Sequence, residues 1–318
     1  MFKKKISLIG YGTWGLGGDS YGYISQSKTQ NLLNYALKKG INFFDTSNIY
    51  GRGLSEKRIG LFLKKNINIR SKIFIATKCG MKNHSPSSWN VPQNFNISFL
   101  KRSIDESLKR LNTNYIDLIQ LHSPPIKLLK NKKKIIKILN FLIKLKNKKK
   151  IVNFGVSVKS PADAIYILQN YKKFKFIQLN FNLMDQRAID CGVLDLAYKK
   201  KVYVISRTPY AFGYLVNNVK FKKLDHRKKW SNKQIAIWNK GRLSFLKIIK
   251  RKNLKSASLA LLFATYHPSI ITVIPGMMSI YEINQALEFL KLKKLSKKEI
   301  KNLRNYYNSI DWIYYEKK

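Results

Sequence analysis

Four side chains in the first half of the chain have the types that proton transfer to a carbonyl oxygen needs. Asp45, Tyr50, Lys78 and His122 each close a short apolar segment or follow it within a few residues. The three segments are rich in β-branched and aromatic residues and are predicted strands: INFFDTS (41–47), KIFIATK (72–78) and YIDLIQLH (115–122). A phenol, an ammonium, a carboxylate and an imidazole at neighbouring strand ends can together make a proton-donating tyrosine.

Each of the four side chains has an expected part in this chemistry. Tyrosine is a weak acid at neutral pH, because its unperturbed pKa is about 10. Lys78 is expected to lower the pKa of Tyr50, because a nearby ammonium favours the phenolate. Asp45 would hold Lys78 in place and keep it protonated, and His122 would hydrogen-bond the substrate carbonyl or tune the phenol. The set predicts carbonyl reduction, in which Tyr50 protonates oxygen while hydride reaches carbon.

Eight short apolar segments alternate with amphipathic stretches along the whole chain. They are nearly continuous in apolar residues, as strands covered on both faces are. Besides the three above they are ISLIGYG (6–12), VNFGVSV (152–158), FIQLNFN (176–182), VYVISRT (202–208) and ITVIPG (271–276). Eight β–α pairs without a Pro-, Gly- or Ser-rich linker predict an α/β protein, a single (β/α)8 TIM-barrel domain over residues 1–318. In such a barrel the reactive groups gather at the carboxyl ends of the strands.

Helical periodicity is expected between and beyond these strands. The predicted helices are 27–39, which starts with a capping serine at Ser27, 53–65, 98–111, 132–147, 161–170, 187–200, 242–253, 256–266 and 280–290. A C-terminal extra helix is predicted at 296–308. The stretch 208–240, after the seventh strand, is basic and carries tryptophans; it is too long for a simple barrel loop and is predicted to be a functional loop over the site.

The charge of the chain is strongly positive, with 62 Lys and Arg against 16 Asp and Glu and a formal charge of +46. Such a balance suggests a nucleic-acid or anionic-membrane partner. However, lysine far outnumbers arginine, whereas a phosphate-binding surface favours the arginine fork. Helix-turn-helix, zinc-finger and RNP-type motifs are also absent from the sequence. We interpret the charge as a spread surface property and expect no specific nucleic-acid partner.

Other features of the sequence indicate a cytoplasmic protein. No apolar run reaches the length of about eighteen residues that a membrane span needs. The N-terminal stretch MFKKKISLIGYGTW begins like a signal peptide, but its apolar part is short and interrupted by glycines. Cys79 and Cys191 suffice for neither a disulfide framework nor a metal cluster, so no metal site is expected.

The segments DTSNIYGRGLSEKRIG (45–60), ATK (76–78) and LIQLH (118–122) resemble the aldo-keto reductase family. The similarity extends over nearly the whole chain. It implies that Asp45, Tyr50, Lys78 and His122 are the catalytic tetrad, with Tyr50 as general acid/base. It also implies an NADP or NAD cofactor, whose binding turn would follow the first strand within GYGTWGLGG, at Gly12, Thr13 and Trp14.

Later segments resemble the rest of the cofactor site of that family. GVSVKS (155–160) and QLNFN (178–182) imply that Ser157 and Gln178 hold the nicotinamide amide, although Val158 replaces a frequent asparagine. Arg207 stands where many members stack a tyrosine on the nicotinamide ring, and an arginine plane can also stack there. IPGMMSIYEINQAL (274–287) resembles the phosphate-binding end and implies contacts from Gly276 and Ser279 at a helix start. Met278 and Ala286 replace the basic residue and the asparagine that often accompany NADP preference.

Several functions remain open at this point. The leading interpretation is reduction of a small aldehyde or ketone, or the reverse oxidation of an alcohol. Alternatives are a sugar or nucleotide-sugar oxidoreductase of the same family and a non-catalytic relative that binds the cofactor and regulates a partner. The sequence identifies neither the substrate, the physiological direction, the cofactor preference nor the oligomeric state, because specificity in such folds depends on loops.

Overall fold

Eight parallel strands form one sheet in the order β1-β2-β3-β4-β5-β6-β7-β8. The computed structural model describes residues 5–85, 88, 91–217 and 225–312. The strands are β1 (Tyr11–Gly12), β2 (Phe43–Asp45), β3 (Phe74–Cys79), β4 (Ile116–His122), β5 (Ile151–Ser157), β6 (Phe176–Asn180), β7 (Tyr203–Arg207) and β8 (Ile270–Ile274). Each lies within a predicted strand segment or within one residue of it.

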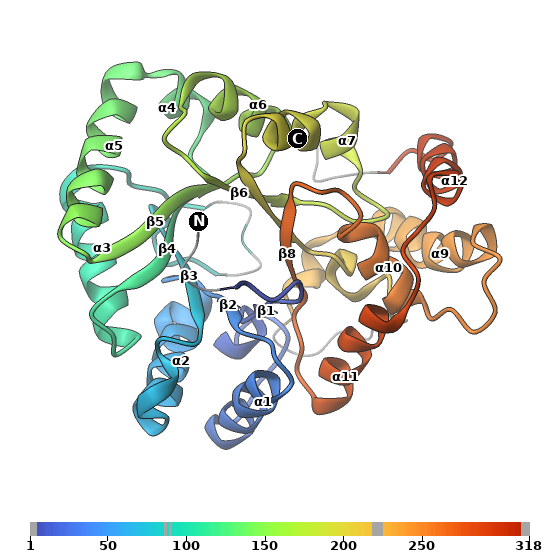
Figure 1. The fold of residues 1–318 in the computed structure, drawn as a ribbon, viewed down its shortest axis with the longest axis horizontal. Helices are drawn as coiled ribbons and strands as arrows, with labels where there is room; N and C mark the ends of the chain where they lie inside the picture. The colour runs from blue at the N-terminus through green and yellow to red at the C-terminus, as the bar shows by residue number, and fades with distance from the viewer. Residues whose placement is uncertain (1–4, 86–87, 89–90, 218–224, 313–318) are drawn as a thin grey trace.

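The last strand returns to the first and closes the sheet. Backbone bridges join Ile9 to Val273 and Gly12 to Gly276, and the amide of Gly10 donates to the carbonyl of Val273 at 2.7 Å. Gly12 is needed here, because a Cβ at this position would lie 2.8 Å from the carbonyl oxygen of Ile274. Figure 1 shows the resulting ring of strands with helices around it, so the predicted (β/α)8 barrel is confirmed.

The interior of the barrel changes from apolar to polar along the strands. Phe43, Phe74 and Phe176 pack in its amino-terminal half, with ring centroids 5.1 Å apart for the first pair and 6.2 Å for the second. Successive side chains on a strand alternate between its faces. Residues two or four positions further along, including Asp45 and Lys78, therefore face the same interior at its carboxyl end.

The helices agree with the predicted ones in most positions. They are α1 (Gln26–Lys38), α2 (Leu54–Lys65), α3 (Ile97–Arg110), α4 (Ile126–Lys130), α5 (Lys132–Asn147), α6 (Pro161–Asn170), α7 (Arg187–Asp190), α8 (Val193–Lys199), α9 (Asn232–Ile248), α10 (Ser256–Ala264), α11 (Ile280–Glu288) and α12 (Lys297–Asn308). The C-terminal extra helix is α12, and its first turn has a reciprocal capping box between Ser296 and Glu299.

Three helix predictions were wrong in detail. The capping serine of α1 is Ser25, which accepts from the amide of Lys28 at 3.2 Å, and not Ser27. The predicted helix 187–200 is broken at Gly192, whose φ of 70° is left-handed. The predicted helix 242–253 is α9, which begins ten residues earlier because Ser231 caps it. The long loop after β7 therefore ends near residue 231 and not at 240.

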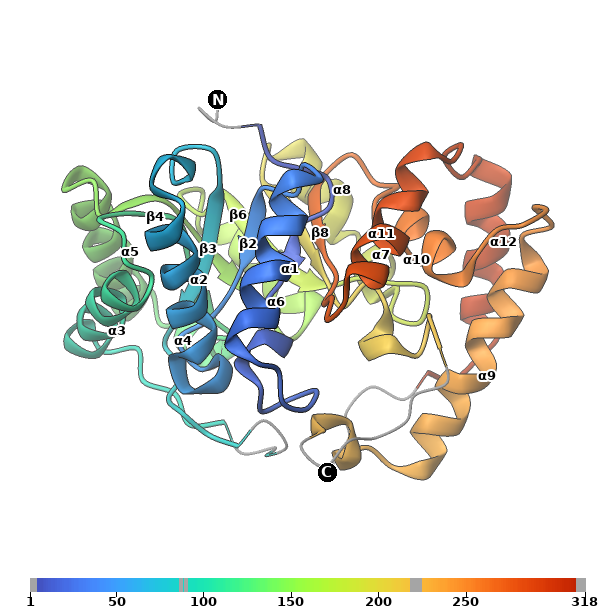
Figure 2. The same cartoon turned by 90° about the horizontal axis from the view of Figure 1, so that it is seen from below.

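The described part of this long loop reaches the turn that follows β1. Asp225 forms a backbone bridge with Tyr21, and the amide of His226 donates to the carbonyl of Ser20 at 3.0 Å. Residues 218–224 of the predicted loop lie outside the described residues. The loops that follow the strands gather along the lower edge of Figure 2, where the loop after β7 approaches the end of the barrel that carries the polar interior.

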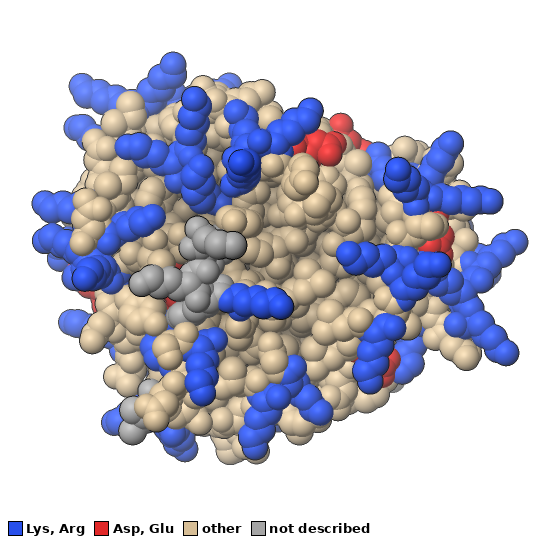
Figure 3. All heavy atoms as spheres, viewed as in Figure 1, with Lys and Arg blue, Asp and Glu red and all other residues tan. Residues whose placement is uncertain are grey.

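Lysine and arginine side chains are spread over the face shown in Figure 3 and do not gather into one stripe. The lysine-rich helix α5 still buries an apolar face, formed by Ile135, Ile138, Leu139, Leu142 and Leu145. Within the described ranges, no helix is long and apolar enough to cross a bilayer.

A buried carboxylate joins the first helices to the barrel. Glu56 on α2 is fully buried; its Oε1 accepts from the Thr77 hydroxyl at 2.6 Å and its Oε2 from Arg110 Nε at 2.7 Å. Arg110 also lies 3.5 Å from Glu106, which is half-exposed. A buried charge that loses its partner is strongly destabilising, whereas an exposed pair contributes little.

We therefore expect Arg110→Met to lower the free energy of unfolding by about 3 kcal/mol, because it leaves the Glu56 carboxylate buried and uncompensated. The control is Glu106→Gln, which removes the exposed partner of the same arginine and should change stability by less than about 0.5 kcal/mol. Urea denaturation followed by circular dichroism measures both. Equal effects of the two variants would contradict the structural role assigned to Glu56.

Candidate active site

The four residues singled out in the sequence meet at the carboxyl end of the barrel. Asp45 ends β2, Lys78 lies near the end of β3 and His122 ends β4. Tyr50 begins a short turn (Tyr50–Gly53) between β2 and α2. Gly51 has a φ of 58°, and a Cβ there would lie 2.3 Å from the carbonyl oxygen of Gly17, so glycine permits the turn that brings Tyr50 back over the barrel.

Lys78 is the centre of this group. Its Nζ donates to Asp45 Oδ2 at 2.7 Å and to the carbonyl of Thr46 at 2.8 Å, and it lies 3.3 Å from the Tyr50 hydroxyl. The Lys78 side chain is 1% exposed. An ammonium has three protons to donate, so these three contacts satisfy a charge that water does not reach.

The phenol of Tyr50 remains a weak acid in this setting. Part of the residue is exposed, but enclosure of the phenol raises its pKa; Lys78 opposes this effect, and the net pKa lies above the ordinary value. The lowering effect expected from Lys78 is thus present, but desolvation of the phenol, which was not considered from the sequence, outweighs it. At neutral pH Tyr50 carries its proton, which is the state that a proton donor requires.

Burial also affects the pKa values of Lys78 and His122, the neighbours of Tyr50. Burial lowers the pKa of Lys78, but the Asp45 carboxylate and the Tyr50 phenol more than offset this, so the net pKa is raised. Burial, then Lys78 and Arg207, hold the pKa of His122 well below its usual value. A neutral imidazole has one donor and one acceptor nitrogen. His122 Nδ1 lies 3.3 Å from the Ser47 hydroxyl, a partner that the sequence analysis missed although it belongs to the DTS segment.

One of the predicted cofactor residues, Gln178, is hydrogen-bonded to Asp45, and a second, Ser157, is hydrogen-bonded to Gln178. The Ser157 hydroxyl at the end of β5 donates to Gln178 Oε1 at 3.0 Å, and Gln178 Nε2 donates to Asp45 Oδ1 at 2.7 Å. No local pattern in the sequence indicates the bond from Gln178 to Asp45, because 133 positions separate the two residues. Ser157, Gln178, Asp45, Lys78 and Tyr50 thus form one continuous chain of contacts.

Arg207 is the last residue of β7 and lies beside this series of contacts. Its Nη2 donates to the carbonyl of Val158 at 2.9 Å, whereas its Nε is buried and has no partner among the described residues. The guanidinium acts electrostatically on both Tyr50 and His122. Arg207 is therefore at the mouth of the barrel, as the predicted contact with a nicotinamide ring requires.

The turn after β1 contributes two residues to the site: Trp14 packs beside Tyr50, and Thr13 bonds to the backbone of Asp45. The Thr13 hydroxyl donates to the carbonyl of Asp45 at 2.8 Å and is fully buried, so it supports the tetrad backbone. The Trp14 ring lies 6.0 Å from the ring of Tyr50 and 4.3 Å from that of His226. His226 was not predicted from the sequence, where its one signal is its place in the aromatic and basic stretch after β7.

The predicted phosphate-binding end lies next to the turn after β1, because a backbone bridge joins Gly276 to Gly12. Gly276 is exposed, and a Cβ there would meet the carbonyl oxygen of Gly12 at 4.0 Å. Ser279 caps α11 and accepts from the amide of Glu282 at 3.2 Å, while the Glu282 carboxylate accepts from the amide of Met278. An acidic side chain therefore lies at the helix start where a phosphate was predicted, and Ala286 is buried within the packed face of α11.

These observations fit a nicotinamide dinucleotide at the mouth. Gly276 leaves room near the start of α11, the buried Arg207 Nε lacks a partner in the described chain, and Gln178 Nε2 retains a second proton. Trp14, Ser157 and Ser279 lie on the same end of the barrel. The cofactor roles of all the predicted residues stay predictions.

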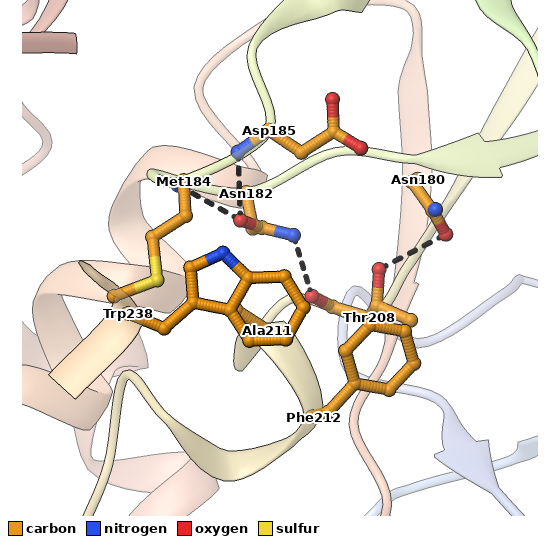
Figure 4. A pocket seen from close by; sticks show the side chains of 8 residues that line it. All are labelled: Asn180, Asn182, Met184, Asp185, Thr208, Ala211, Phe212 and Trp238. Carbon is orange, nitrogen blue, oxygen red and sulfur yellow. Dashed lines mark hydrogen bonds between the residues drawn. The ribbon is translucent and has the colours of Figure 1, made fainter. Parts of the chain in front are cut away.

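A small pocket lies between the end of β6, the loops after β6 and β7, and α9 (Figure 4). It is lined by Asn180, Asn182, Met184, Asp185, Thr208, Ala211, Phe212 and Trp238. Its polar groups mostly bond to one another or to nearby backbone: Asn182 donates to the carbonyl of Thr208 at 2.9 Å, and Arg187 pairs with Asp185 at 2.7 Å. None of Asp45, Tyr50, Lys78 and His122 lines this pocket.

Comparison with known proteins agrees with the fold and the motifs. The model of the Aldo/keto reductase family matches residues 8–308. L-galactose dehydrogenase of Arabidopsis thaliana is 28% identical over 286 residues, covering 88% of this chain and 83% of that protein. The aldo-keto reductase yakc [NADP(+)] of Schizosaccharomyces pombe is 28% identical over 309 residues, covering 94% and 88%.

Among solved structures, the glycerol dehydrogenase AKR11B4 from Gluconobacter oxydans has the same fold, with a TM-score of 0.78 at 24% identity, covering 96% of this chain and 92% of that one. The family model spans nearly the whole chain and includes all four residues of the tetrad. The protein is thus an oxidoreductase that belongs to the aldo/keto reductase family.

Proposed function

We propose that the protein reduces an aldehyde or ketone with NADPH or NADH, or oxidises the corresponding alcohol, with Tyr50 as general acid/base. The observation that carries this proposal is the position of Lys78 Nζ, which lies 2.7 Å from Asp45 and 3.3 Å from the Tyr50 hydroxyl. A buried ammonium against a phenol stabilises the charge that appears when the phenol gives up its proton.

Each protein group has a defined task in this reaction. The bound cofactor supplies the hydride. Tyr50 donates its proton to the carbonyl oxygen, and Lys78 stabilises the phenolate that remains. Asp45 keeps Lys78 charged and oriented, and neutral His122 can donate a hydrogen bond to the same carbonyl oxygen. Such a positioned proton donor contributes about 10²–10⁴ in rate.

A polyhydroxylated substrate is a second, narrower possibility for the same chemistry. Two of the similar proteins are named as dehydrogenases of L-galactose and of glycerol. A sugar-type substrate is therefore a reasonable first class to assay beside simple aldehydes and ketones. The alternative of a non-catalytic regulator is disfavoured by the complete contact network around Lys78.

Tyr50→Phe should lower kcat at least 100-fold, because it removes the proton donor and almost no packing volume, while cofactor affinity should stay near the wild-type value. Steady-state reduction of nitrobenzaldehyde and quenching of protein fluorescence by NADPH measure the two quantities. The control is Tyr214→Phe, since Tyr214 is fully buried and its hydroxyl has no partner in the described chain. Near-native turnover of Tyr50→Phe would exclude Tyr50 as the acid.

Cofactor preference should depend on the acidic start of α11. The Glu282 carboxylate accepts from the Met278 amide and would repel a 2′-phosphate at this helix start, where Met278 also lacks the charge of a basic residue. We therefore propose that NADPH is accepted with reduced selectivity over NADH.

Glu282→Gln should raise the NADPH-to-NADH ratio of kcat/KM by about tenfold, which corresponds to roughly 1.4 kcal/mol. The expected cause is loss of the repulsion between the Glu282 carboxylate and the 2′-phosphate at the amino-terminal end of α11. Met278→Arg should also raise the ratio. The control is Glu288→Gln at the other end of the helix, where the half-exposed carboxylate pairs with Lys255. An unchanged cofactor ratio in Glu282→Gln would rule out this role.

A further inference from the structure

We infer that Gln178 is a positioning residue for Asp45, and that its side-chain amide holds the carboxylate in the orientation that binds Lys78 beneath Tyr50. This inference rests on the proposed function, in which Tyr50 is the proton donor. It differs from the role implied for Gln178 by family resemblance, which concerns only the nicotinamide amide.

The position of Gln178 in the barrel makes this contact possible. In a ring of eight strands, β6 and β2 are four strands apart and face each other across the axis. Gln178 reaches across that axis from β6, and its Nε2 lies 2.7 Å from Asp45 Oδ1. Both side chains are buried, so water does not compete for the bond.

The orientation of the amide is determined by its two partners. A carboxylate can only accept hydrogen bonds, so the NH2 group of Gln178 must face Asp45. The carbonyl oxygen Oε1 then points to Ser157, whose hydroxyl donates to it at 3.0 Å. Ser157 is the register partner of Gln178 on the neighbouring strand, so the backbone of the sheet fixes this second contact.

The two oxygens of Asp45 are divided between two donors. Oδ2 accepts from Lys78 and Oδ1 accepts from Gln178, each at 2.7 Å. Without Gln178, Oδ1 would be a buried acceptor with no side-chain donor, and the carboxylate could turn away from its bond to Lys78. Gln178 therefore acts on Lys78 through Asp45, without touching the ammonium itself.

The hydrogen bond from Gln178 to Asp45 should influence the pKa of Tyr50. The charged and titratable groups that face Tyr50 are Lys78, Asp45, Arg207 and His122. After burial itself, which raises the pKa of Tyr50, Lys78 lowers it and Asp45 raises it. The hydrogen bond from Gln178 disperses part of the Asp45 charge, so its loss should raise the pKa of Tyr50 further.

The same amide can also serve the cofactor. Gln178 Nε2 carries two protons, and Asp45 uses one of them. The second proton and the lone pairs of the Ser157 hydroxyl remain for a carboxamide. Gln178 thus connects the place where the nicotinamide amide is expected with the carboxylate that supports the proton donor.

The test is the variant Gln178→Leu, which keeps the size of the side chain and removes the donor to Asp45. Tyr50 is titrated by ultraviolet absorbance of tyrosinate in the cofactor-free protein, as the difference between proteins with and without Tyr50→Phe. We expect the midpoint to move upward by about half to one pH unit, because loss of the charge-assisted hydrogen bond leaves more negative charge on Asp45. An unshifted midpoint would overturn the inference.

The matched control is Gln120→Leu, the same substitution in the same barrel interior. Gln120 is the register partner of Lys78 on β4 and is fully buried, but neither of its amide atoms has a partner in the described chain. In Gln120→Leu, the titration midpoint of Tyr50 should equal that of the wild type. A shift as large as that of Gln178→Leu would mean that any change of interior polarity suffices, and would contradict a specific role of Gln178.

Two further arms keep the test decisive. If Gln178→Leu does not fold, Ser157→Ala replaces it: loss of the hydroxyl that orients the amide should give a smaller upward shift, and no shift would overturn the inference. Reduction of nitrobenzaldehyde by Tyr50→Phe tests the proposed function separately. An active Tyr50→Phe defeats that function, whereas an inactive Tyr50→Phe with an unshifted Gln178→Leu defeats only the role of Gln178.

Discussion

The buried ion pair between Lys78 and Asp45 is the interaction on which the rest of the site depends. An unpaired charge in a protein interior is very costly, so Lys78 can remain an ammonium there only with a carboxylate and further acceptors close by. Asp45 and the carbonyl of Thr46 supply them at 2.7 and 2.8 Å. The third donor position of Lys78 is then directed to Tyr50, and the phenol lies against a fixed positive charge.

The barrel explains how such a pair is assembled from distant parts of the chain. Parallel strands bring their carboxyl ends to one edge, and alternation along each strand directs every second side chain into the barrel, where an apolar layer precedes a polar one. Phe43 and Phe74 fill the apolar layer directly below Asp45 and Lys78 on the same two strands. The apolar amino-terminal half of the barrel interior lowers the local dielectric constant. The few oriented polar groups at its carboxyl end therefore act strongly on the phenol of Tyr50.

Much of this arrangement could be predicted from the sequence, because strand ends and barrel topology follow from local patterns. The eight strands and the convergence of Asp45, Lys78 and His122 depend only on short apolar segments and their order. The net rise in the pKa of Tyr50 was not predicted, since the degree of enclosure is a tertiary property. The bond from Gln178 to Asp45 and the ring of His226 on Trp14 were missed, because each joins strands or loops that no local pattern relates.

The central claim, that Lys78 and Asp45 act as a unit on Tyr50, is tested most directly by a double-mutant cycle. Lys78→Met, Asp45→Asn and the double variant are compared with the wild type by kcat/KM for nitrobenzaldehyde reduction at saturating NADPH. We predict that the double variant loses less than the two single losses combined, with a coupling of about 1.5 kcal/mol or more. Strictly additive losses would show that the two residues act independently and would contradict the account.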